Sequence, residues 1–397
     1  MKKFGLLPRI ILAIGLGIAV GLVSPDWLTK IFATFNGLFG NFLGFAIPLI
    51  IIGFIAPGIG TMGKGAGKLL GITTGIAYGS TIIAGLFAYF TATTLYPVIL
   101  KNQSLKEFGN PEEALLSPYF TVDMPPIMGV MSALLMAFTI GLGLAAIKGD
   151  ALQNAMNDFR DIVEKLIEKT IIPLLPIHIF GIFANMTQGG QVSAIMSVFA
   201  KVFVMIIALH IIYLLVQYSV AGSAARKNPL KMLKEMLPAY FTALGTQSSA
   251  STIPVTLKHA KKIGAREKTA DFAVPLLATI HLSGSTITLV SCSIAVMMLQ
   301  GQTASFSTLL PFILMLGITM IAAPGVPGGA VMAALGLLES MLGFTDTMLA
   351  LMIALYLAQD SFGTACNVTG DGAITVIADK VSCKKSISKL QQTAKAS

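Results

Sequence analysis

Long apolar runs recur along this chain, and they constrain its fold more than any other feature of the sequence. Examples extend from Ile10 to Val23, from Leu70 to Phe90 and from Val202 to Val216. A helix needs roughly 20 predominantly apolar residues to cross the hydrocarbon core of a bilayer. Of the 397 residues, 55% are hydrophobic and only 11% are charged, and no large soluble domain fits between the runs. The sequence therefore predicts an all-α polytopic membrane protein.

The basic residues predict how the chain is oriented in the membrane. A net charge of +9 would suit a nucleic-acid-binding protein, but the lysines and arginines cluster in short loops between the apolar runs. That distribution follows the positive-inside rule, and it argues against a nucleic-acid partner. The start of the chain, Met1 to Phe4, is interpreted as the inner end of a first spanning helix. We expect a multi-pass protein surrounded by the lipid of a bacterial or archaeal inner membrane.

Two apolar segments depart from a simple series of spans. Basic residues flank the first segment at 225–234 and at 258–268, and its middle carries the polar run 245–254. The second segment, between Gln300 and Asp346, is interrupted by prolines and glycines, which break a helix. We expect two re-entrant hairpins that enter from opposite faces, each followed by a long span. Such a repeated pair is the inverted repeat found in many secondary transporters.

The last span carries two acidic residues, Asp360 and Asp371, whose burial in a membrane is costly unless they are paired. Thr364 and Asn367 lie between them, and the spacing of four, three and four places all four residues on one face of a helix. Two carboxylates, a hydroxyl and an amide in one stripe suit an ammonium group and a desolvated cation. The alternative is that the neighbouring backbone satisfies both carboxylates and that no ligand binds.

The preceding span contains a polar patch at 279–286, where we expect the helix to unwind and to free carbonyl groups for a cation. His281 in this patch could ligate a cation, donate a hydrogen bond or carry a proton, and a packed histidine without such a role is the alternative. His178 and His210 are expected to be structural, and His259 to be solvated near the inner face. The sequence contains no metalloprotease or serine-hydrolase motif, so it predicts no enzyme.

These motifs resemble those of a known transporter family. The serine-rich first tip, the Gly325-Val326-Pro327-Gly328 tip and the run Asn367-Val368-Thr369-Gly370-Asp371 are similar to the dicarboxylate/amino acid:cation symporter family, which has the glutamate-transporter fold. The resemblance covers nearly the whole chain. It implies eight transmembrane helices with two hairpins, a homotrimer and an elevator mechanism. It also implies scaffold helices at 1–66 and 126–190, a transport domain at 67–100 and 191–379, and a cytoplasmic tail at 380–397.

The resemblance further implies roles for individual residues. Asp360 would bind the amino group of the substrate, and Asn367 its α-carboxylate. Further substrate contacts would come from Thr364, Ser285 and Gly363, and from the hairpin tips through Ser249 and Val326. Asp371 would ligate sodium together with the Asn367 carbonyl. The interrupted span adds the candidate cation ligands Leu277, Thr279 and His281.

One departure from the family pattern concerns the substrate. Members that carry acidic substrates have an arginine three residues after the aspartate that binds the amino group, and here that position is Gly363. An anionic side chain would lack its bidentate partner, so we expect a small neutral amino acid and some added space at Gly363. An acidic amino acid or dicarboxylate symporter, and an uncoupled channel or receptor on the same fold, are the alternatives.

A second departure concerns the cations. The Asn-Met-Asp-Gly-Thr patch of the family reads His281-Leu282-Ser283-Gly284-Ser285 here, so a serine replaces the aspartate that would hold one sodium ion. Counting without gaps from Lys68 places Ile76 and Ala77 where two hydroxyl groups would complete that site. We therefore expect this cation site to be absent. Either fewer sodium ions move in each cycle, or a proton on His281 supplies the missing charge.

Overall fold

All regular elements in the described part of the chain are helical. A computed structural model describes residues 6–63, 68–99, 115–190, 192–321, 323 and 327–393. The helices of its first half are α1 (Leu6–Gly21), α2 (Asp26–Gly63), α3 (Lys68–Ile99), α4 (Val130–Ala146), α5 (Ala151–Leu166), a π-helical turn (Ile167–Ile171), α6 (Ile172–Gln188) and α7 (Val192–Ala225). Those of its second half are α8 (Pro229–Glu235), α9 (Leu237–Thr246), α10 (Ser249–Ile263), α11 (Glu267–Ile280), α12 (Ser283–Leu299), α13 (Phe306–Met320), α14 (Gly329–Leu342) and α15 (Asp346–Thr393).

Six helical segments in the described ranges are long and apolar enough to cross a bilayer. They cover residues 26–61, 69–99, 151–188, 195–225, 267–299 and 346–382. The expected count of eight would also require α1 and α4, which have 16 and 17 residues. At 1.5 Å per residue each extends about 25 Å, somewhat less than the roughly 30 Å of a hydrocarbon core. A polytopic, all-helical membrane protein is therefore confirmed, whereas the count of eight stays a prediction.

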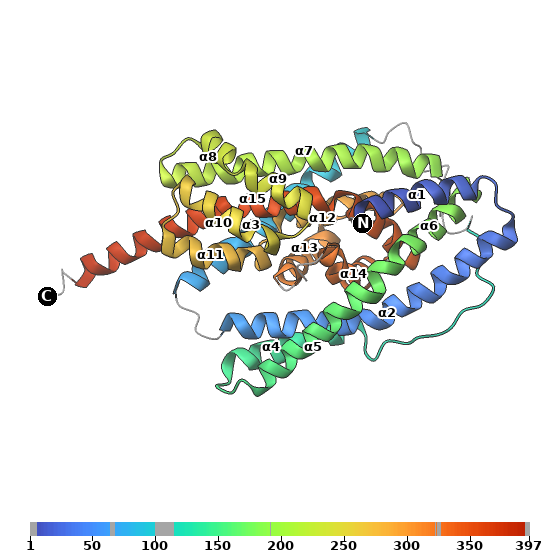
Figure 1. Ribbon diagram of the computed structural model, residues 1–397, viewed down its shortest axis with the longest axis horizontal. Coiled ribbons are helices and arrows are strands. Elements are labelled where there is room, and N and C mark those ends of the chain that lie inside the picture. Colours follow the sequence, from blue (N-terminus) through green and yellow to red (C-terminus); the bar gives the residue numbers. More distant parts are fainter. Residues whose placement is uncertain are drawn as a thin grey trace.

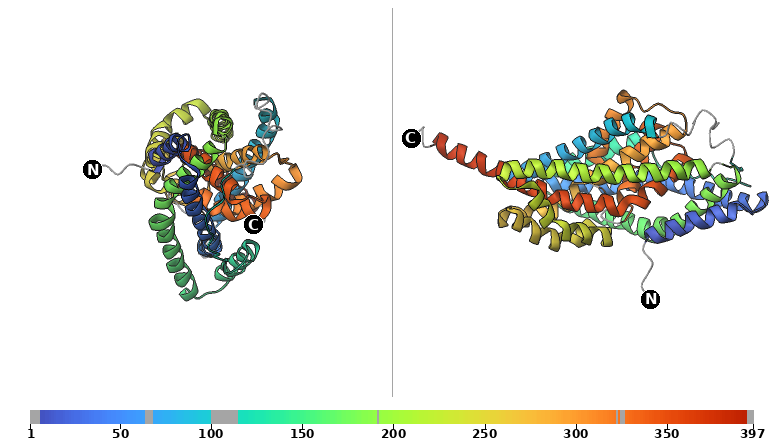
Figure 2. Two further views of the ribbon diagram at one scale, coloured as in Figure 1. Left: turned by 90° about the vertical axis from the view of Figure 1, so that its right-hand side faces the viewer. Right: turned by 90° about the horizontal axis from the view of Figure 1, so that it is seen from above.

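The helices run mostly along the long axis of the molecule and pack in two groups (Figure 1). In one group α1 packs on α6, and α2 packs on α4, α5 and α6. In the other, α15 lies against α7, α9, α10, α11 and α12, and α3 packs on α12 and α13. Figure 2, seen along the long axis, shows α2, α4 and α5 on one side of this second group. The helices α12 and α15 are therefore the most enclosed, which places their polar residues deep in the protein.

The two segments expected to form re-entrant hairpins each contain a pair of short helices that pack on each other, α9 with α10 and α13 with α14, and their re-entrant course stays a prediction. In the first, α9 ends at Gln247, whose φ of 53° turns the chain, and the Ser248 hydroxyl caps α10 by accepting the Ser251 N–H. In the second, α14 begins after Gly328, whose φ of 77° lies in the left-handed region that favours glycine. The tip residue Val326 lies outside the described residues. Each tip thus ends on the N-terminus of a helix.

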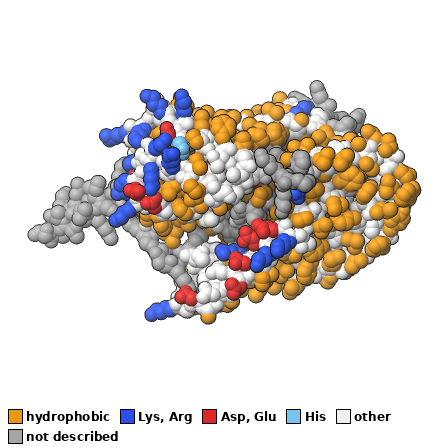
Figure 3. All heavy atoms as spheres, viewed as in Figure 1, with side chains coloured by type: hydrophobic (Ala, Val, Ile, Leu, Met, Phe, Trp, Pro, Cys, Tyr) orange, Lys and Arg blue, Asp and Glu red, His pale blue; other side chains and the backbone are white. Residues whose placement is uncertain are grey.

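The basic residues gather at the end of the molecule formed by α8, α10 and α11 (Figure 3). Here the sequence-based expectation for His259 was wrong, because its exposed fraction is only 9%. Its Nδ1 atom lies 3.0 Å from Oε1 of Glu235, which joins α10 to α8. The hydrogen bond from Lys262 to Glu235 holds the pKa of that carboxyl below its usual value. The neighbouring lysines suggested a solvated ring, whereas the ring is buried and contacts a carboxylate of another helix.

Candidate functional site

The polar stripe on α15 is buried along its whole length. Asp360, Thr364, Asn367 and Asp371 each have an exposed fraction of 6% or less. The helix runs without interruption through all four positions, so their spacing places them on one face, as the sequence predicted. That face turns towards α11 and α12, the two halves of the interrupted span.

The interruption itself lies at His281 and Leu282, between α11 and α12. Asn367 stabilises the start of α12, since its Oδ1 atom accepts the N–H groups of Gly284 (2.7 Å) and Ser285 (3.2 Å). Its amide nitrogen also donates to the Ser285 hydroxyl at 2.9 Å. Much of the Asn367 side chain is therefore used to hold the two halves of the span in place.

Carbonyl groups at the end of α11 have no hydrogen-bond partner among the described residues. Those of Ala278, Thr279 and Ile280 accept no hydrogen bond from any described residue, whereas the Leu277 carbonyl accepts the His281 N–H at 2.9 Å. A helix C-terminus is electronegative, and free carbonyl oxygens are the ligands that broken transporter helices offer to sodium. The break thus creates a place where a cation could bind, although Leu277, one of the expected ligands, has its carbonyl occupied.

A small pocket lies between the stripe, the break and both hairpin tips. The stripe contributes Tyr356, Asp360, Thr364 and Asn367, and the interrupted span contributes Ala278, Thr279, Leu282 and Ser285. The tips contribute Gln247, Ser249, Ala323 and Ala330. The enclosed volume is about 30 Å³, enough for about two water molecules. The pocket is therefore small. Asp360 is the one charged side chain among these lining residues, so the lining carries a negative charge.

Asp360 already has one partner in this pocket. Its Oδ2 atom accepts the N–H of Gly328 at 2.7 Å, at the N-terminus of α14. A carboxylate at a helix N-terminus is favoured by the helix dipole. The carboxylate therefore links α15 to the second hairpin, and it has no basic side chain beside it in the pocket.

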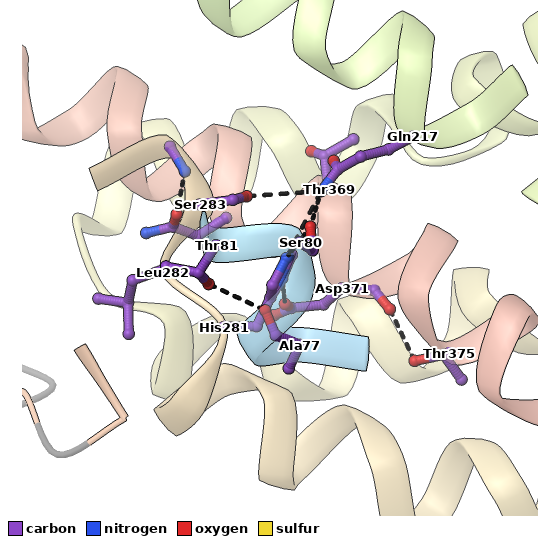
Figure 4. A network of polar contacts seen from close by, with 12 residues as sticks. Ala77, Ser80, Thr81, Gln217, His281, Leu282, Ser283, Thr369, Asp371 and Thr375 are labelled. Atoms are coloured by element: carbon purple, nitrogen blue, oxygen red, sulfur yellow. Dashed lines mark hydrogen bonds and ion pairs between the residues drawn. The ribbon is translucent and has the colours of Figure 1, made fainter. Parts of the chain in front are cut away.

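Asp371 has a different environment, which Figure 4 shows. Its Oδ1 atom lies 2.8 Å from Nδ1 of His281, and both side chains are almost completely buried. The other ring nitrogen, Nε2, lies 3.0 Å from the hydroxyl of Ser80 on α3. Both nitrogens of His281 thus have partners, so the ring has no free nitrogen for a cation. In this arrangement the Oδ1 atom of Asp371 is hydrogen-bonded within the protein.

Several members of this cluster were not identified from the sequence. Gln217 on α7 donates to the Ser80 hydroxyl at 3.0 Å, and the Tyr213 hydroxyl donates to the Ser80 carbonyl at 2.6 Å. Counting without gaps had pointed to Ile76 and Ala77, which lack hydroxyl groups. The structure places a hydroxyl one helical turn further on, at Ser80, where it contacts His281; the absence of that cation site stays a prediction. A shift by one turn keeps the same helix face and could have revealed this hydroxyl.

Gly363 is not among the residues that line the pocket. A Cβ atom there would lie 3.6 Å from the Ser285 nitrogen and from the Thr288 hydroxyl, both on α12. A Cβ on the facing Gly284 would come within 2.5 Å of the Gly363 carbonyl oxygen. Gly284 lets α12 and α15 approach closely, and α12 borders the space that we expected at Gly363. Ser249, Ser285 and Thr279 do line the pocket, and their roles as substrate contacts and as a cation ligand stay predictions.

The remaining two histidines lie outside this pocket. His210 on α7 directs Nε2 at the Gly284 carbonyl (3.0 Å) and at the Thr288 hydroxyl (3.2 Å). His178 on α6 directs Nδ1 at the side chain of Asn36, 3.1 Å away. Both are buried and hydrogen-bonded, in keeping with the structural role expected for them.

Comparison with known proteins places the chain among membrane transporters. Residues 6–381 match the sodium:dicarboxylate symporter family. The serine/threonine transporters SstT of Acinetobacter baumannii strains AYE and ATCC 17978 are each 26% identical to the chain over 394 residues, which cover 95% of this chain and 97% of theirs. The family and these relatives are transporters and not enzymes. The chain belongs to the sodium:dicarboxylate symporter family.

Proposed function

We propose that this protein is a secondary-active symporter of a small neutral amino acid, driven by sodium. The observation that carries the proposal is the charge of the pocket, where Asp360 is the one ionisable group with a full charge among the described lining residues. A zwitterion brings one ammonium group for this carboxylate. Its own carboxylate needs hydrogen-bond donors, which the pocket also offers. The printed names of the relatives, serine/threonine transporters, support a substrate of this size.

A dicarboxylate fits this pocket poorly. It would place two negative charges beside Asp360 with no arginine or lysine among the described lining residues. Burying like charges together without a cation is strongly unfavourable. The absence of a cationic side chain at this site therefore favours a neutral amino acid over the dicarboxylates after which the family is named.

The pocket suggests how such a substrate is oriented. Its ammonium group would bind Asp360, where the Gly328 N–H now occupies only one carboxylate oxygen. The first turn of α10 provides donors for the substrate carboxylate, because the N–H groups of Ser249 and Ala250 have no partner among the described residues. Thr364 and Asn367 lie along the same wall. The side chain of the substrate would then lie towards the remaining wall, near Tyr356 and Ser285.

Sodium coupling is supported by the family and by the free carbonyl groups of Ala278, Thr279 and Ile280. We propose that sodium binds at this end of α11, beside the substrate. Asp371 was expected to ligate sodium together with the Asn367 carbonyl, but its Oδ1 atom is occupied by His281. We therefore place the histidine, and no second sodium ion, on that side of Asp371, with proton coupling through His281 as the alternative.

The proposal also covers the division into domains, the oligomeric state and the transport movement. The two groups of packed helices support a division into a scaffold, at 1–66 and 126–190, and a transport domain, at 67–100 and 191–379. The family resemblance supports a homotrimer in the plasma membrane and an elevator movement. The exposed apolar side chains on several helices, for example Leu12, Leu135 and Val204, suit contact with lipid.

Uptake into proteoliposomes tests the proposal. Radiolabelled serine should accumulate under an inward sodium gradient, and Asp360→Asn should reduce the initial rate at least 100-fold because the ammonium group loses its charged partner. Asp161→Asn, which changes an aspartate whose side chain is 58% exposed on α5, is the matched control and should transport normally. Normal uptake by the Asp360 variant would exclude the proposed ammonium contact.

The same vesicles separate the modes of coupling. Sodium and proton gradients are imposed independently on the wild-type protein and on His281→Gln. Uptake driven by sodium alone, with no response to a proton gradient, supports the proposal. A proton response that disappears in the histidine variant while its sodium-driven uptake persists would establish the proton alternative, and downhill flux without accumulation would indicate a channel.

A further inference from the structure

Another cavity lies at the basic end of the molecule (Figure 3), where the end of α7 meets α8 and the end of α10. Its volume is about 360 Å³, and it shares none of its described lining residues with the candidate substrate pocket. The charged and polar lining residues are Lys227, Asn228, Lys231, Glu235 and Lys262. Three lysines and one glutamate give this lining a net positive charge, so the cavity suits an anion.

The backbone holds the two lysines nearest the end of α7 at this cavity. The chain turns after α7, where the Lys227 N–H donates to the Gly222 carbonyl at 2.9 Å, a bond typical of helix C-termini. The Lys227 side chain reaches α10, where its Nζ atom donates to the Ile263 carbonyl at 3.1 Å. Asn228 then caps α8 by accepting the N–H of Lys231 at 3.1 Å. Lys227 and Lys231 therefore border one cavity from two elements.

The lysines at this end differ in how far their charge is compensated. Lys261, which does not line the cavity, has two acidic partners at 3.1 and 2.7 Å. Glu235, the acidic residue of the cavity, already contacts Lys262 at 2.9 Å. Lys227 and Lys231 form no ion pair with any residue in the described ranges. Two positive charges of the cavity are thus available to an anion from outside the protein.

The surface beside the cavity indicates that this anion belongs to a lipid. The helix α7 exposes apolar side chains along its length, at Val204, Ile211, Leu215, Val216 and Val220. The last of them lies close to the end of α7 at Ala225, and Leu230 on α8, next to Lys231, is 65% exposed. Exposed apolar side chains suit acyl chains, and basic pockets at the cytoplasmic ends of spanning helices bind anionic headgroups. The basic residues also predict that this end faces the cytoplasm.

We propose that this cavity binds the phosphate group of an anionic phospholipid from the surrounding membrane, with Lys227 and Lys231 as its charged contacts. The Asn228 amide nitrogen, which has no partner among the described residues, supplies a further donor. Free phosphate and glycerol phosphate carry the same chemical group, but they lack the acyl chains that the exposed surface of α7 would contact. The bound lipid would connect the ends of α7, α8 and α10.

Competition between two lipids tests the proposal. The full-length protein in non-ionic detergent is mixed with equal amounts of dioleoyl phosphatidylglycerol and dioleoyl phosphatidylcholine, and native mass spectrometry measures the ratio of the bound lipids. The acyl chains are identical, so the ratio reports on the headgroup. Wild type should prefer phosphatidylglycerol about tenfold, and the double variant Lys227→Gln with Lys231→Gln should bring the ratio close to one.

The double variant Lys258→Gln with Lys268→Gln is the matched control. Both lysines are exposed at the same end of the molecule, on α10 and α11, and neither lines the cavity. The control variant loses as much positive charge as the cavity variant, yet it should keep the wild-type ratio. Equal losses of preference in the two variants would overturn the proposal, because general attraction to the basic end would then explain the preference.

Two measurements on the wild type alone also decide the matter, even if the cavity variant fails to fold. A ratio of bound lipids near one would overturn the proposal. Glycerol 3-phosphate, added at the same concentration as the lipid, should leave phosphatidylglycerol bound. Displacement of the lipid by this soluble phosphate would overturn the assignment to a phospholipid and would indicate a site for soluble phosphate compounds.

Discussion

Asp360 and Asp371 are two buried carboxylates on one face of one helix, yet the protein surrounds them in opposite ways. Asp360 borders a pocket and has a backbone N–H from the second hairpin as its hydrogen-bond partner. Asp371 faces the ring of His281, which is itself held by Ser80. Asp360 has no basic side chain beside it among the described residues of the pocket, while Asp371 has the imidazole of His281 as its partner.

The difference shows how similar residues acquire different functions. A buried carboxylate requires a positive charge or several hydrogen bonds. Where the fold supplies a basic side chain, the carboxylate becomes part of the structure. Where no basic side chain lies beside the carboxylate and a cavity borders it, the carboxylate can bind a cationic group of a ligand. We therefore expect stability to depend on the Asp371 end of the stripe and substrate binding to depend on the Asp360 end.

The largest expected effect on stability comes from removing His281. His281→Gln leaves Asp371 buried without its basic partner, and breaking a buried pair in this way costs about 3–5 kcal/mol. Asp360→Asn should cost less than about 1 kcal/mol, because the asparagine oxygen can still accept the Gly328 N–H. Thermal unfolding of both variants in detergent measures the difference.

The double variant His281→Gln with Asp371→Asn sharpens this test. It removes the charge along with its partner, so it should recover part of the stability that His281→Gln loses. Equal losses of stability in His281→Gln and Asp360→Asn would show that the two ends of the stripe contribute equally to stability, against the expectation.

A smaller effect is expected from adding a methyl group to either of two glycines on α15. A Cβ at Gly370 would lie 2.7 Å from Oε1 of Gln217 and 3.2 Å from Cε1 of His281, so Gly370→Ala should destabilise the protein by about 1–3 kcal/mol. Gly363→Ala has ordinary contacts of 3.6 Å or more and should be neutral or stabilising, since alanine favours a helix. Thermal unfolding of the two variants tests this, and Gly370→Ala should have the lower unfolding temperature. A lower unfolding temperature for Gly363→Ala would mean that the His281 cluster is loosely packed.

The smallest expected effect concerns a single hydroxyl group. Ser80→Ala leaves His281 and Gln217 without a shared partner and should cost about 1 kcal/mol. Ser291 on α12 is also buried, but its hydroxyl has no hydrogen-bond partner, so Ser291→Ala should cost nothing measurable. Chemical or thermal unfolding of the two variants in parallel would show whether Ser80 belongs to the cluster, and equal stabilities would argue that it does not.

Much of the architecture could be predicted because its signals are local. The apolar runs, the prolines and glycines at 323–329 and the four-three-four spacing from Asp360 to Asp371 each lie within one segment of the chain. Extending that spacing back by one turn would also have identified Tyr356. The solvation of His259 was predicted wrongly, since Glu235 reaches it from a different helix.

The sequence by itself determined that the chain is a helical membrane protein with two broken segments and a buried polar stripe, because periodicity and apolar length are properties of neighbouring residues. Only the tertiary structure decided which groups satisfy that stripe. His281 and Asp371 are 90 positions apart, and Ser80 and His281 are 201 apart. Packing of α3, α11, α12 and α15 brings such residues together, so that the Asp371 end of the stripe is hydrogen-bonded within the protein while the Asp360 end borders a pocket.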